Sequence, residues 1–228
     1  MAYRAIWLDV DGTLMDFEAA SRRGFARVMG ALGLPAGEGA LARFERINRA
    51  LWSAHERGEI PREQVLQRRF TELFAQQGWA ADGLAAEEAY QGMLAASADL
   101  IEGAEEALAY LSARYPLYAA TNGVAHTQRN KMALAGIDRY FTDLFISEEL
   151  GCQKPQPGFF RAGLARMGDP DPAGVLMIGD ALASDMAGAA AAGMGTCWFN
   201  PSGAANALGV RVDRQIARLD QLWREGIA

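Results

Sequence analysis

The feature of the sequence that most limits its fold is the placement of its short apolar runs. One run occupies residues 3–8, and four more come much later in the chain, at 116–120, 144–147, 175–178 and 195–199. Segments with a helical pattern adjoin the later runs. Short apolar runs that alternate with helices are typical of a parallel sheet covered on both faces. The chain is therefore expected to have an α/β fold.

Residues 17–98 carry a different pattern, with no run that resembles a strand. Apolar residues recur there at the spacing of one helix face. Breaks that contain glycine fall at 33–39, 58–61 and 78–83. This pattern predicts four helices that form an all-helical insert between the first strand and the rest of the sheet. The predicted domains are a core of residues 1–16 and 99–228 and a helical insert of residues 17–98.

The composition is that of an ordinary globular protein. Hydrophobic residues make up 50% of the chain, the net charge is −6 and the pI is near 5.1. A mildly acidic chain gives no support to a partner that is a nucleic acid polymer or a membrane. No apolar stretch approaches the roughly 20 residues of a membrane-spanning helix. Two distant cysteines, Cys152 and Cys197, indicate neither a disulfide framework nor a zinc site, so we expect a reduced, cytoplasmic setting. The expected assembly is a monomer or a small homo-oligomer.

The first apolar run ends in the sequence Asp-Val-Asp-Gly-Thr, residues 9–13. Ligands of open parallel sheets bind at the carboxyl ends of the strands, so polar residues there are candidates for a site. A carboxylate at Asp9 can attack phosphorus and form an acyl phosphate. Asp11 can face the same side, protonate the leaving oxygen and then take a proton from the attacking water.

Two further segments carry polar residues suited to a phosphate. Thr121, Asn122 and Gly123 follow the second apolar run, and a hydroxyl with backbone amides at the start of a helix suits a phosphoryl oxygen. Lys154 lies in the segment Gly-Cys-Gln-Lys-Pro. A fixed cation there would offset the charge of the phosphate and of the nucleophile.

Asp180 and Asp185 follow the fourth run. Carboxylates in this position suit a hard cation that prefers oxygen ligands, and Mg²⁺ would screen the repulsion between an anionic nucleophile and a phosphate. Each of these segments alone is common in turns and loops. Their occurrence together, each near the end of a strand, predicts a magnesium-dependent site for phosphoryl transfer.

The same segments resemble the four motifs of the haloacid dehalogenase superfamily. They are residues 9–14, Thr121 with Asn122, Lys154, and Gly179-Asp180 with Asp185, in the order that the family has. The resemblance implies a Rossmann-like core and an aspartyl-phosphate intermediate. The helical insert after the first motif is similar to the family's C1 cap, which closes over the site and chooses the substrate.

The resemblance also implies a role for each matched residue. Asp9 would be nucleophile and metal ligand. Asp11 would be the acid and base, and its backbone carbonyl would also bind the metal. Asp180 would bind the metal, and Asp185 would support the metal ligands or Lys154. Members that act on carbon–halogen bonds lack the second aspartate of the first motif, so the presence of Asp11 favours hydrolysis of phosphate esters.

A narrower resemblance is to the non-canonical pyrimidine nucleotidase branch of the superfamily. That branch cleaves nucleoside 5′-monophosphates, which makes a small phosphorylated metabolite of this kind the expected substrate. Where the branch often has Asp-Ala-Asp-x-Thr, this chain has Asp-Val-Asp-Gly-Thr. The segments that carry the resemblance are residues 48–52, 55–60, 69–70, 145–151 and 195–198.

Other functions stay open at the level of the sequence. A sugar-phosphate phosphatase or a phosphosugar mutase would share the same core motifs, and so would a regulatory module that binds phosphate without turnover. A phosphonate-cleaving enzyme would need a Schiff-base lysine in the insert, and residues 17–98 contain no lysine. Among the remaining polar residues, His126 is expected at the surface and Cys152 in a packing role.

Overall fold

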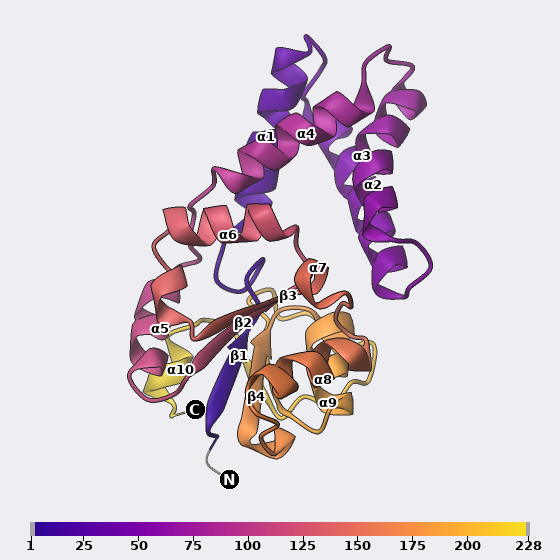
Figure 1. Cartoon of the computed structure of the whole chain (residues 1–228). Coiled ribbons are helices and arrows are strands. Elements are labelled where there is room, and N and C mark those ends of the chain that lie inside the picture. Colours follow the sequence, from indigo (N-terminus) through magenta and orange to yellow (C-terminus); the bar gives the residue numbers. More distant parts are fainter. Residues whose placement is uncertain (1–2, 227–228) are drawn as a thin grey trace. The chain divides into compact units, whose positions relative to one another are not determined.

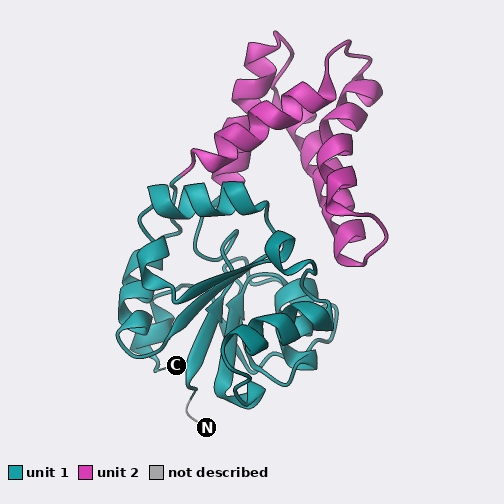
Figure 2. Cartoon of the chain, in the orientation of Figure 1, with its two compact units in different colours: residues 1–17, 98–228 teal, residues 18–97 magenta. Residues whose placement is uncertain are grey.

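The computed structural model describes residues 3–226, so residues 1, 2, 227 and 228 of the predicted core domain lie outside the described part. The chain divides into two compact units (Figure 2). The first comprises Met1–Phe17 and Ala98–Ala228, and the second comprises Glu18–Ser97. The chain therefore leaves the first unit once, after the first strand, and returns to it before the rest of the sheet.

The first unit is built on one six-stranded sheet with the order β3-β2-β1-β4-β5-β6, in which all neighbouring strands are parallel. The bounds are β1 Ala5–Leu8, β2 Leu117–Thr121, β3 Asp143–Ile146, β4 Val175–Gly179, β5 Gly195–Phe199 and β6 Arg214–Ile216. The α/β fold with a Rossmann-like sheet is confirmed. The sequence pattern predicts the first five strands and misses β6, because its three residues carry no apolar run.

Helices cover both faces of this sheet (Figure 1). Side chains alternate along each strand, so that Ile6 and Leu8 pack with α5, α6 and α10, whereas Ala5 and Trp7 pack with α8 and α9. Strands β1, β2, β4 and β5 are buried throughout, which is what a sheet covered on both faces requires. The helical elements are α5 Ala104–Ser112, α6 Ala125–Leu134, η1 Asp138–Tyr140, α7 Ser147–Leu150, α8 Pro157–Arg166, η2 Pro172–Gly174, η3 Leu182–Met186, α9 Ala187–Ala191 and α10 Gln221–Arg224.

The second unit consists of four helices, as the periodicity predicts. They are α1 Phe17–Ala31, α2 Glu38–Glu56, α3 Arg62–Gln77 and α4 Gly83–Ala95, and α1 begins at the last residue of the first unit. Phe25, Phe44, Phe70 and Tyr90 form its centre, with ring centroids 4.8 to 6.4 Å apart. None of the helices within residues 3–226 combines the length and the apolar composition that a bilayer crossing demands.

Candidate active site

Asp9 lies directly after β1, at the carboxyl edge of the sheet. Its backbone N–H donates to the carbonyl oxygen of Ile178 at 2.9 Å, so the pairing of β1 with β4 continues through Asp9. The side chain is only 9% exposed. One carboxylate oxygen accepts from Lys154 Nζ at 2.6 Å, and the other accepts from the Thr13 hydroxyl at 3.3 Å. The strand therefore ends in a buried carboxylate that faces a cation.

Gly12 brings the turn after Asp9 close to Asp180. Its φ of 85° lies in the left-handed region, which glycine adopts without strain. A Cβ atom on Gly12 would lie 2.6 Å from Oδ2 of Asp180, well inside van der Waals contact. The Thr13 hydroxyl lies 3.4 Å from Oδ1 of Asp180 as well as close to Asp9. A glycine at position 12 thus allows the two strand-end carboxylates to approach one another.

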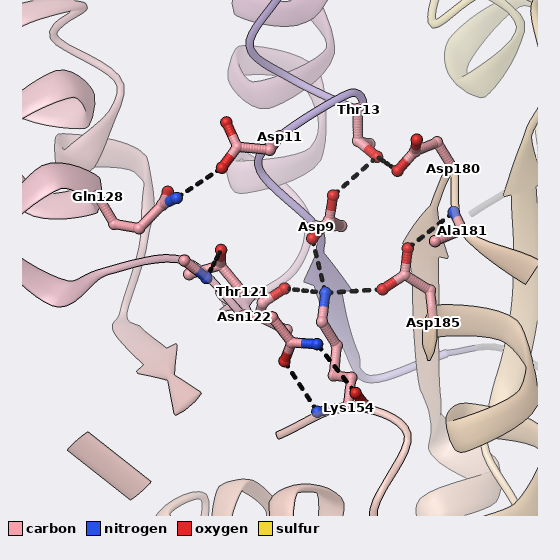
Figure 3. A network of polar contacts seen from close by, with 12 residues as sticks. Asp9, Asp11, Thr13, Thr121, Asn122, Gln128, Lys154, Asp180, Ala181 and Asp185 are labelled. Carbon is pink, nitrogen blue, oxygen red and sulfur yellow. Dashed lines mark hydrogen bonds and ion pairs between the residues drawn. The ribbon is translucent and has the colours of Figure 1, made fainter. Parts of the chain in front are cut away.

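Lys154 connects three elements through its ammonium group (Figure 3). Its Nζ atom donates to Asp9 at 2.6 Å, to Asp185 at 2.7 Å and to the carbonyl oxygen of Ala120 at 2.6 Å. The side chain is 2% exposed. Burial alone would lower the pKa of this ammonium, but the Asp185 and Asp9 carboxylates outweigh burial and raise the pKa above its usual value. Lys154 therefore stays charged, and all three of its protons have acceptors.

Asp185 is held by a π-helical turn that follows β4. In η3 the carbonyl oxygen of Ala181 accepts from the N–H groups of both Asp185 and Met186. The second carboxylate oxygen of Asp185 accepts from the N–H of Ala181 at 3.1 Å. Gly179 leaves the space that this carboxylate fills, since a Cβ atom there would overlap with it. The widened turn thus directs Asp185 back toward Lys154, a use of π-helical turns that is frequent at functional sites.

The three carboxylates of Asp9, Asp180 and Asp185 converge. One oxygen from each lies within 4.8 Å of the other two, which is the spacing that shared ligands of one ion require. Asp9 and Asp185 are buried, and Asp180 is partly exposed. The cluster is thus reached from solvent on the side of Asp180.

Crowding of these carboxylates changes their acidity. Burial, and to a lesser extent the neighbouring Asp185, raise the pKa of Asp9 from 3.8 to about 7 against the opposing effect of Lys154. Burial and the neighbouring Asp9 and Asp185 raise the pKa of Asp180 to about 8. For both groups, burial and the neighbouring carboxylates together outweigh the opposing positive charge of Lys154.

The predicted phosphate-binding residues lie at the end of β2. Thr121 is the last residue of the strand and is buried, and its Oγ1 accepts from the N–H of Gly123 at 3.1 Å. Asn122 makes two hydrogen bonds of 2.9 Å with the backbone of Lys154. The structure thus places Thr121 and Gly123 at the same edge as Asp9, while the Asn122 side chain contacts Lys154.

The structure brings two residues to Asp11 that the sequence did not single out. Gln128 and Lys131, both on α6, contact its two carboxylate oxygens: Gln128 Nε2 donates at 2.6 Å to one, and Lys131 Nζ forms an ion pair with the other (Figure 3 shows the Gln128 contact). His126, on the same helix, is exposed. The one sequence signal for Lys131 was its rarity, since Lys131 and Lys154 are the only lysines in the chain.

A shallow hollow of about 210 Å³ adjoins the site on the side of β5. Trp198 lines this hollow, and its indole N–H donates to the backbone carbonyl of Asp180 at 2.8 Å. Gly12 and Asn200 also line it. The Asp180 carboxylate therefore lies where a small polar group in solvent can reach it.

Strand-end aspartates, a buried lysine and a threonine at one sheet edge are the arrangement expected from the four motifs. The family model for haloacid dehalogenase-like hydrolases matches residues 3–193. The chain belongs to the haloacid dehalogenase-like hydrolases. The resemblance found in the sequence, both to this family and to its pyrimidine nucleotidases, is confirmed by the relatives described next.

Several members of the family match almost the whole chain. HAD-hydrolase YfnB of Bacillus subtilis (strain 168) is 34% identical over 221 residues, which cover 97% of this chain and 94% of YfnB. A crystal structure of YfnB bound to magnesium has a TM-score of 0.93 at 33% identity and covers 99% of both chains. The pyrimidine 5′-nucleotidase PynA of Streptococcus pneumoniae is 34% identical over 202 residues, 88% of this chain and 85% of PynA. The pyrimidine 5′-nucleotidase YjjG of Escherichia coli (strain K12) is 30% identical over 205 residues, 88% of this chain and 87% of YjjG.

Enzymes of this haloacid dehalogenase-like family generally use Mg²⁺, and the residues of this chain fit such an ion. The fit rests on three converging carboxylates and on the raised pKa values of Asp9 and Asp180. When the four carboxyl groups of Asp9, Asp11, Asp180 and Asp185 are all ionised, the positive charges that lie beside them among the described residues are those of Lys131 and Lys154. Two negative charges are left over among these six side chains, which is the charge that one divalent cation would balance.

Proposed function

We propose that this chain is a magnesium-dependent phosphomonoester hydrolase that passes the phosphoryl group through Asp9. The observation that carries the proposal is the buried contact of Lys154 with both Asp9 and Asp185 at 2.6 and 2.7 Å. This contact fixes a nucleophilic carboxylate next to a permanent positive charge. A carboxylate held in this way is oriented for attack. The ammonium group of Lys154 is already in place to offset the negative charge of the carboxylate and of an incoming phosphoryl group.

In the proposed mechanism the reaction has two steps. In the first, Asp9 forms a bond to phosphorus, the bond from phosphorus to the leaving oxygen breaks, and Asp11 protonates that oxygen. In the second, water attacks the aspartyl phosphate, Asp11 takes a proton from the water, and Asp9 is released as a carboxylate. The Thr121 hydroxyl already accepts from Gly123, so its own proton is available to a phosphoryl oxygen.

Asp9, Asp180 and Asp185, together with the backbone carbonyl of Asp11, would hold the Mg²⁺ ion. When bound, the ion offsets the negative charge that otherwise keeps a phosphate away from these carboxylates. Lys154 acts through its charge, because its three donors are already bonded to protein oxygens. Asn122 supports the backbone from which Lys154 extends.

A pyrimidine nucleoside 5′-monophosphate is the substrate that we propose. Support comes from the similarity to PynA and YjjG, which extends over 88% of this chain in each case. We assign the choice of substrate to residues 17–98 as a cap, because in the proposed mechanism the strand-end residues act on the phosphoryl group, which all these substrates share. A hexose phosphate, as substrate of a phosphatase or a mutase, is the alternative that the cap could equally select.

The proposal includes the setting in which the enzyme works. A small phosphorylated metabolite, free cysteines at 152 and 197 and a mildly acidic chain suit a cytoplasmic enzyme that acts as a monomer or a small homo-oligomer. Burial raises the pKa of the Cys197 thiol to about 12, and burial also raises the pKa of Cys152. Neither thiol is therefore a candidate nucleophile.

Phosphate release from a panel of esters tests the proposal. The panel contains UMP, dTMP, AMP, a hexose phosphate and p-nitrophenyl phosphate, each with Mg²⁺ and with a chelator. We expect release only with Mg²⁺ and a preference for UMP or dTMP. Asp9→Asn should abolish turnover, whereas the matched variant Asp138→Asn, at an exposed position of η1, should keep it.

Three outcomes would count against the proposal in different ways. Turnover that survives the chelator or Asp9→Asn would rule out the mechanism. A preference for the hexose phosphate would replace the proposed substrate and leave the mechanism intact. Binding of Mg²⁺ and of a phosphate mimic without hydrolysis of any ester would favour a regulatory module.

A further inference from the structure

Both lysines of the chain lie in the site, although the chain has 20 arginines. Lys154 contacts Asp9, and Lys131 contacts Asp11, so that each aspartate of the first motif has its own ammonium group. The side chains of Lys131 and Lys154 are 4% and 2% exposed. Lysine is almost never fully buried unless it is paired, so the position of Lys131 points to a specific task.

Gln128 and Lys131 reach Asp11 as a pair. They are three positions apart on α6, which places them on the same face of the helix. Gln128 Nε2 donates to Oδ2 at 2.6 Å, and Lys131 pairs with Oδ1. Contacts at both oxygens fix the plane of the carboxylate as well as its position. Gln128 itself is buried, and its Oε1 atom has no hydrogen-bond partner among the described residues.

Gly123 provides the space that Gln128 occupies. A Cβ atom on Gly123 would overlap with the end of the Gln128 side chain. Gly123 is not among the glycines with positive φ, so it is needed here for space and not for its backbone conformation. The turn after β2 and the helix α6 are therefore adapted to one another so that Gln128 can reach Asp11.

We propose that Gln128 and Lys131 are positioning residues that hold the carboxyl group of Asp11 in the direction needed for proton transfer, with Gly123 leaving room for them. This inference rests on the proposed function. Without the two contacts, the 26% exposed side chain of Asp11 could rotate at a turn rich in negative charge. Lys131 offsets the repulsion between Asp11 and the other carboxylates, and Gln128 restricts the rotation.

Two proton transfers depend on this orientation of Asp11, and the bonds and protons balance in each step. As the bond from Asp9 to phosphorus forms and the bond to the leaving oxygen breaks, a proton moves from Asp11 to that oxygen and an alcohol leaves. As water then attacks phosphorus, its proton moves to Asp11 and the bond from Asp9 to phosphorus breaks. A displaced Asp11 would slow the first step only for leaving groups that need the proton.

The leaving group therefore provides the test. A nucleoside 5′-monophosphate releases an alcohol and needs protonation, whereas p-nitrophenyl phosphate releases a stabilised phenolate and does not. Since kcat/KM reports the reaction up to formation of the phosphoenzyme, it isolates the first step. Lys131→Met, Gln128→Ala and Gly123→Ala should each lower kcat/KM for UMP by about tenfold or more and for p-nitrophenyl phosphate by less than about threefold. Lys131→Arg should recover part of the loss, and the exposed control Asn130→Ala should match the unmodified protein.

A second measurement does not depend on activity. With ¹³C-labelled lysine, the metal-free protein should give one set of side-chain NMR signals for each of its two lysines. Asp11→Asn should shift the Lys131 signals and leave those of Lys154 in place. A Lys131 signal that does not respond to Asp11→Asn would overturn the inference.

The kinetic outcomes separate this inference from the proposed function. Equal losses for UMP and p-nitrophenyl phosphate in the Lys131 and Gln128 variants, or no loss for either, would overturn the positioning role while hydrolysis itself stands. Failure of the unmodified protein to hydrolyse any ester with Mg²⁺ would instead overturn the proposed function and this inference with it.

Discussion

Asn122 and Lys154, 32 positions apart in sequence, are joined by two reciprocal hydrogen bonds. The Asn122 amide donates to the Lys154 carbonyl oxygen at 2.9 Å, and its side-chain oxygen accepts from the Lys154 N–H at 2.9 Å. An asparagine can make this pair of bonds because it carries a donor and an acceptor on one planar group. The Asn122 side chain thereby fixes the backbone from which Lys154 extends.

Replacing Asn122 should lower turnover without removing any charged group. In Asn122→Ala both bonds to Lys154 are lost, and we expect kcat to fall by about 10- to 100-fold, because small displacements of a catalytic group have effects of that size. Steady-state kinetics with the best substrate of the panel measure this. Asn130→Ala is the control, since Asn130 lies exposed on α6. Equal kcat values in the two variants would show that Lys154 needs no such support.

Mg²⁺ should stabilise the protein more strongly at higher pH. The pKa values of Asp9 and Asp180 are raised from 3.8 to about 7 and about 8, so both groups bind protons more tightly in the folded metal-free protein than in the unfolded chain. Their contribution to stability is therefore complete below about pH 4 and is lost as the pH rises through 7 to 8. Mg²⁺ binds the deprotonated carboxylates and must compete with protons at low pH.

Thermal unfolding with and without about 10 mM Mg²⁺ tests this pH dependence. The rise in Tm on addition of Mg²⁺ should be small at pH 5.5 and amount to several degrees at pH 8. Asp180→Asn should raise the Tm of the metal-free protein at pH 8, because one crowded charge is gone, and should weaken the response to Mg²⁺. A response of the same size at both pH values would contradict the assignment of these carboxylates to the ion.

Gly12→Ala should remove metal binding, whereas Gly33→Ala should not. Both glycines have positive φ, 85° and 66°, so each substitution strains the backbone by about 1–2 kcal/mol. Only the Cβ atom at position 12 meets another group, the Asp180 carboxylate, while the one at position 33 meets nothing within 4 Å. Urea unfolding should therefore show similar losses of stability for both variants. The rise in Tm with Mg²⁺ and the catalytic activity should disappear only in Gly12→Ala, and their persistence would show that Asp180 can move aside.

The parts of this site that follow directly from a strand could be predicted from the sequence. Asp9, Thr121 and Asp180 each end or follow an apolar run, and parallel strands bring their carboxyl ends to one edge. The four helices of the second unit could also be predicted, because an amphipathic period of 3.6 residues is a local property of the sequence.

The parts that were missed depend on relationships with no local signal. The strand β6 has three residues and becomes a strand only by pairing with β5. Gln128 and Lys131 are separated from Asp11 by 117 and 120 positions, and nothing in a helix sequence shows which partner its inner face will meet. Asn122 was predicted as a substrate contact from its place in the motif, and that contact stays a prediction.

Arg69 forms a buried ion pair inside the helical unit. It donates to both carboxylate oxygens of Glu87 at 2.6 Å and to Asn48 at 2.9 Å, and its guanidinium lies 4.6 Å from the centre of the Tyr90 ring. The side chains of Arg69 and Glu87 are only 1% and 8% exposed. Removal of one partner from such a pair leaves the other as an uncompensated buried charge.

Arg69→Met should therefore destabilise the protein by about 3–5 kcal/mol, measured by urea unfolding followed by circular dichroism and fluorescence. The neighbouring pair of Arg68 and Glu72 is a matched control, because its side chains are 46% and 34% exposed and Arg68→Met should cost less than about 1 kcal/mol. The double variant Arg69→Met with Glu87→Leu should recover part of the loss, since no unpaired charge is then buried. If Arg69→Met is no more harmful than Arg68→Met, the bond that Gln91 donates to Glu87 at 2.9 Å is enough to keep that carboxylate buried, and the ion pair does not determine how α3 and α4 pack.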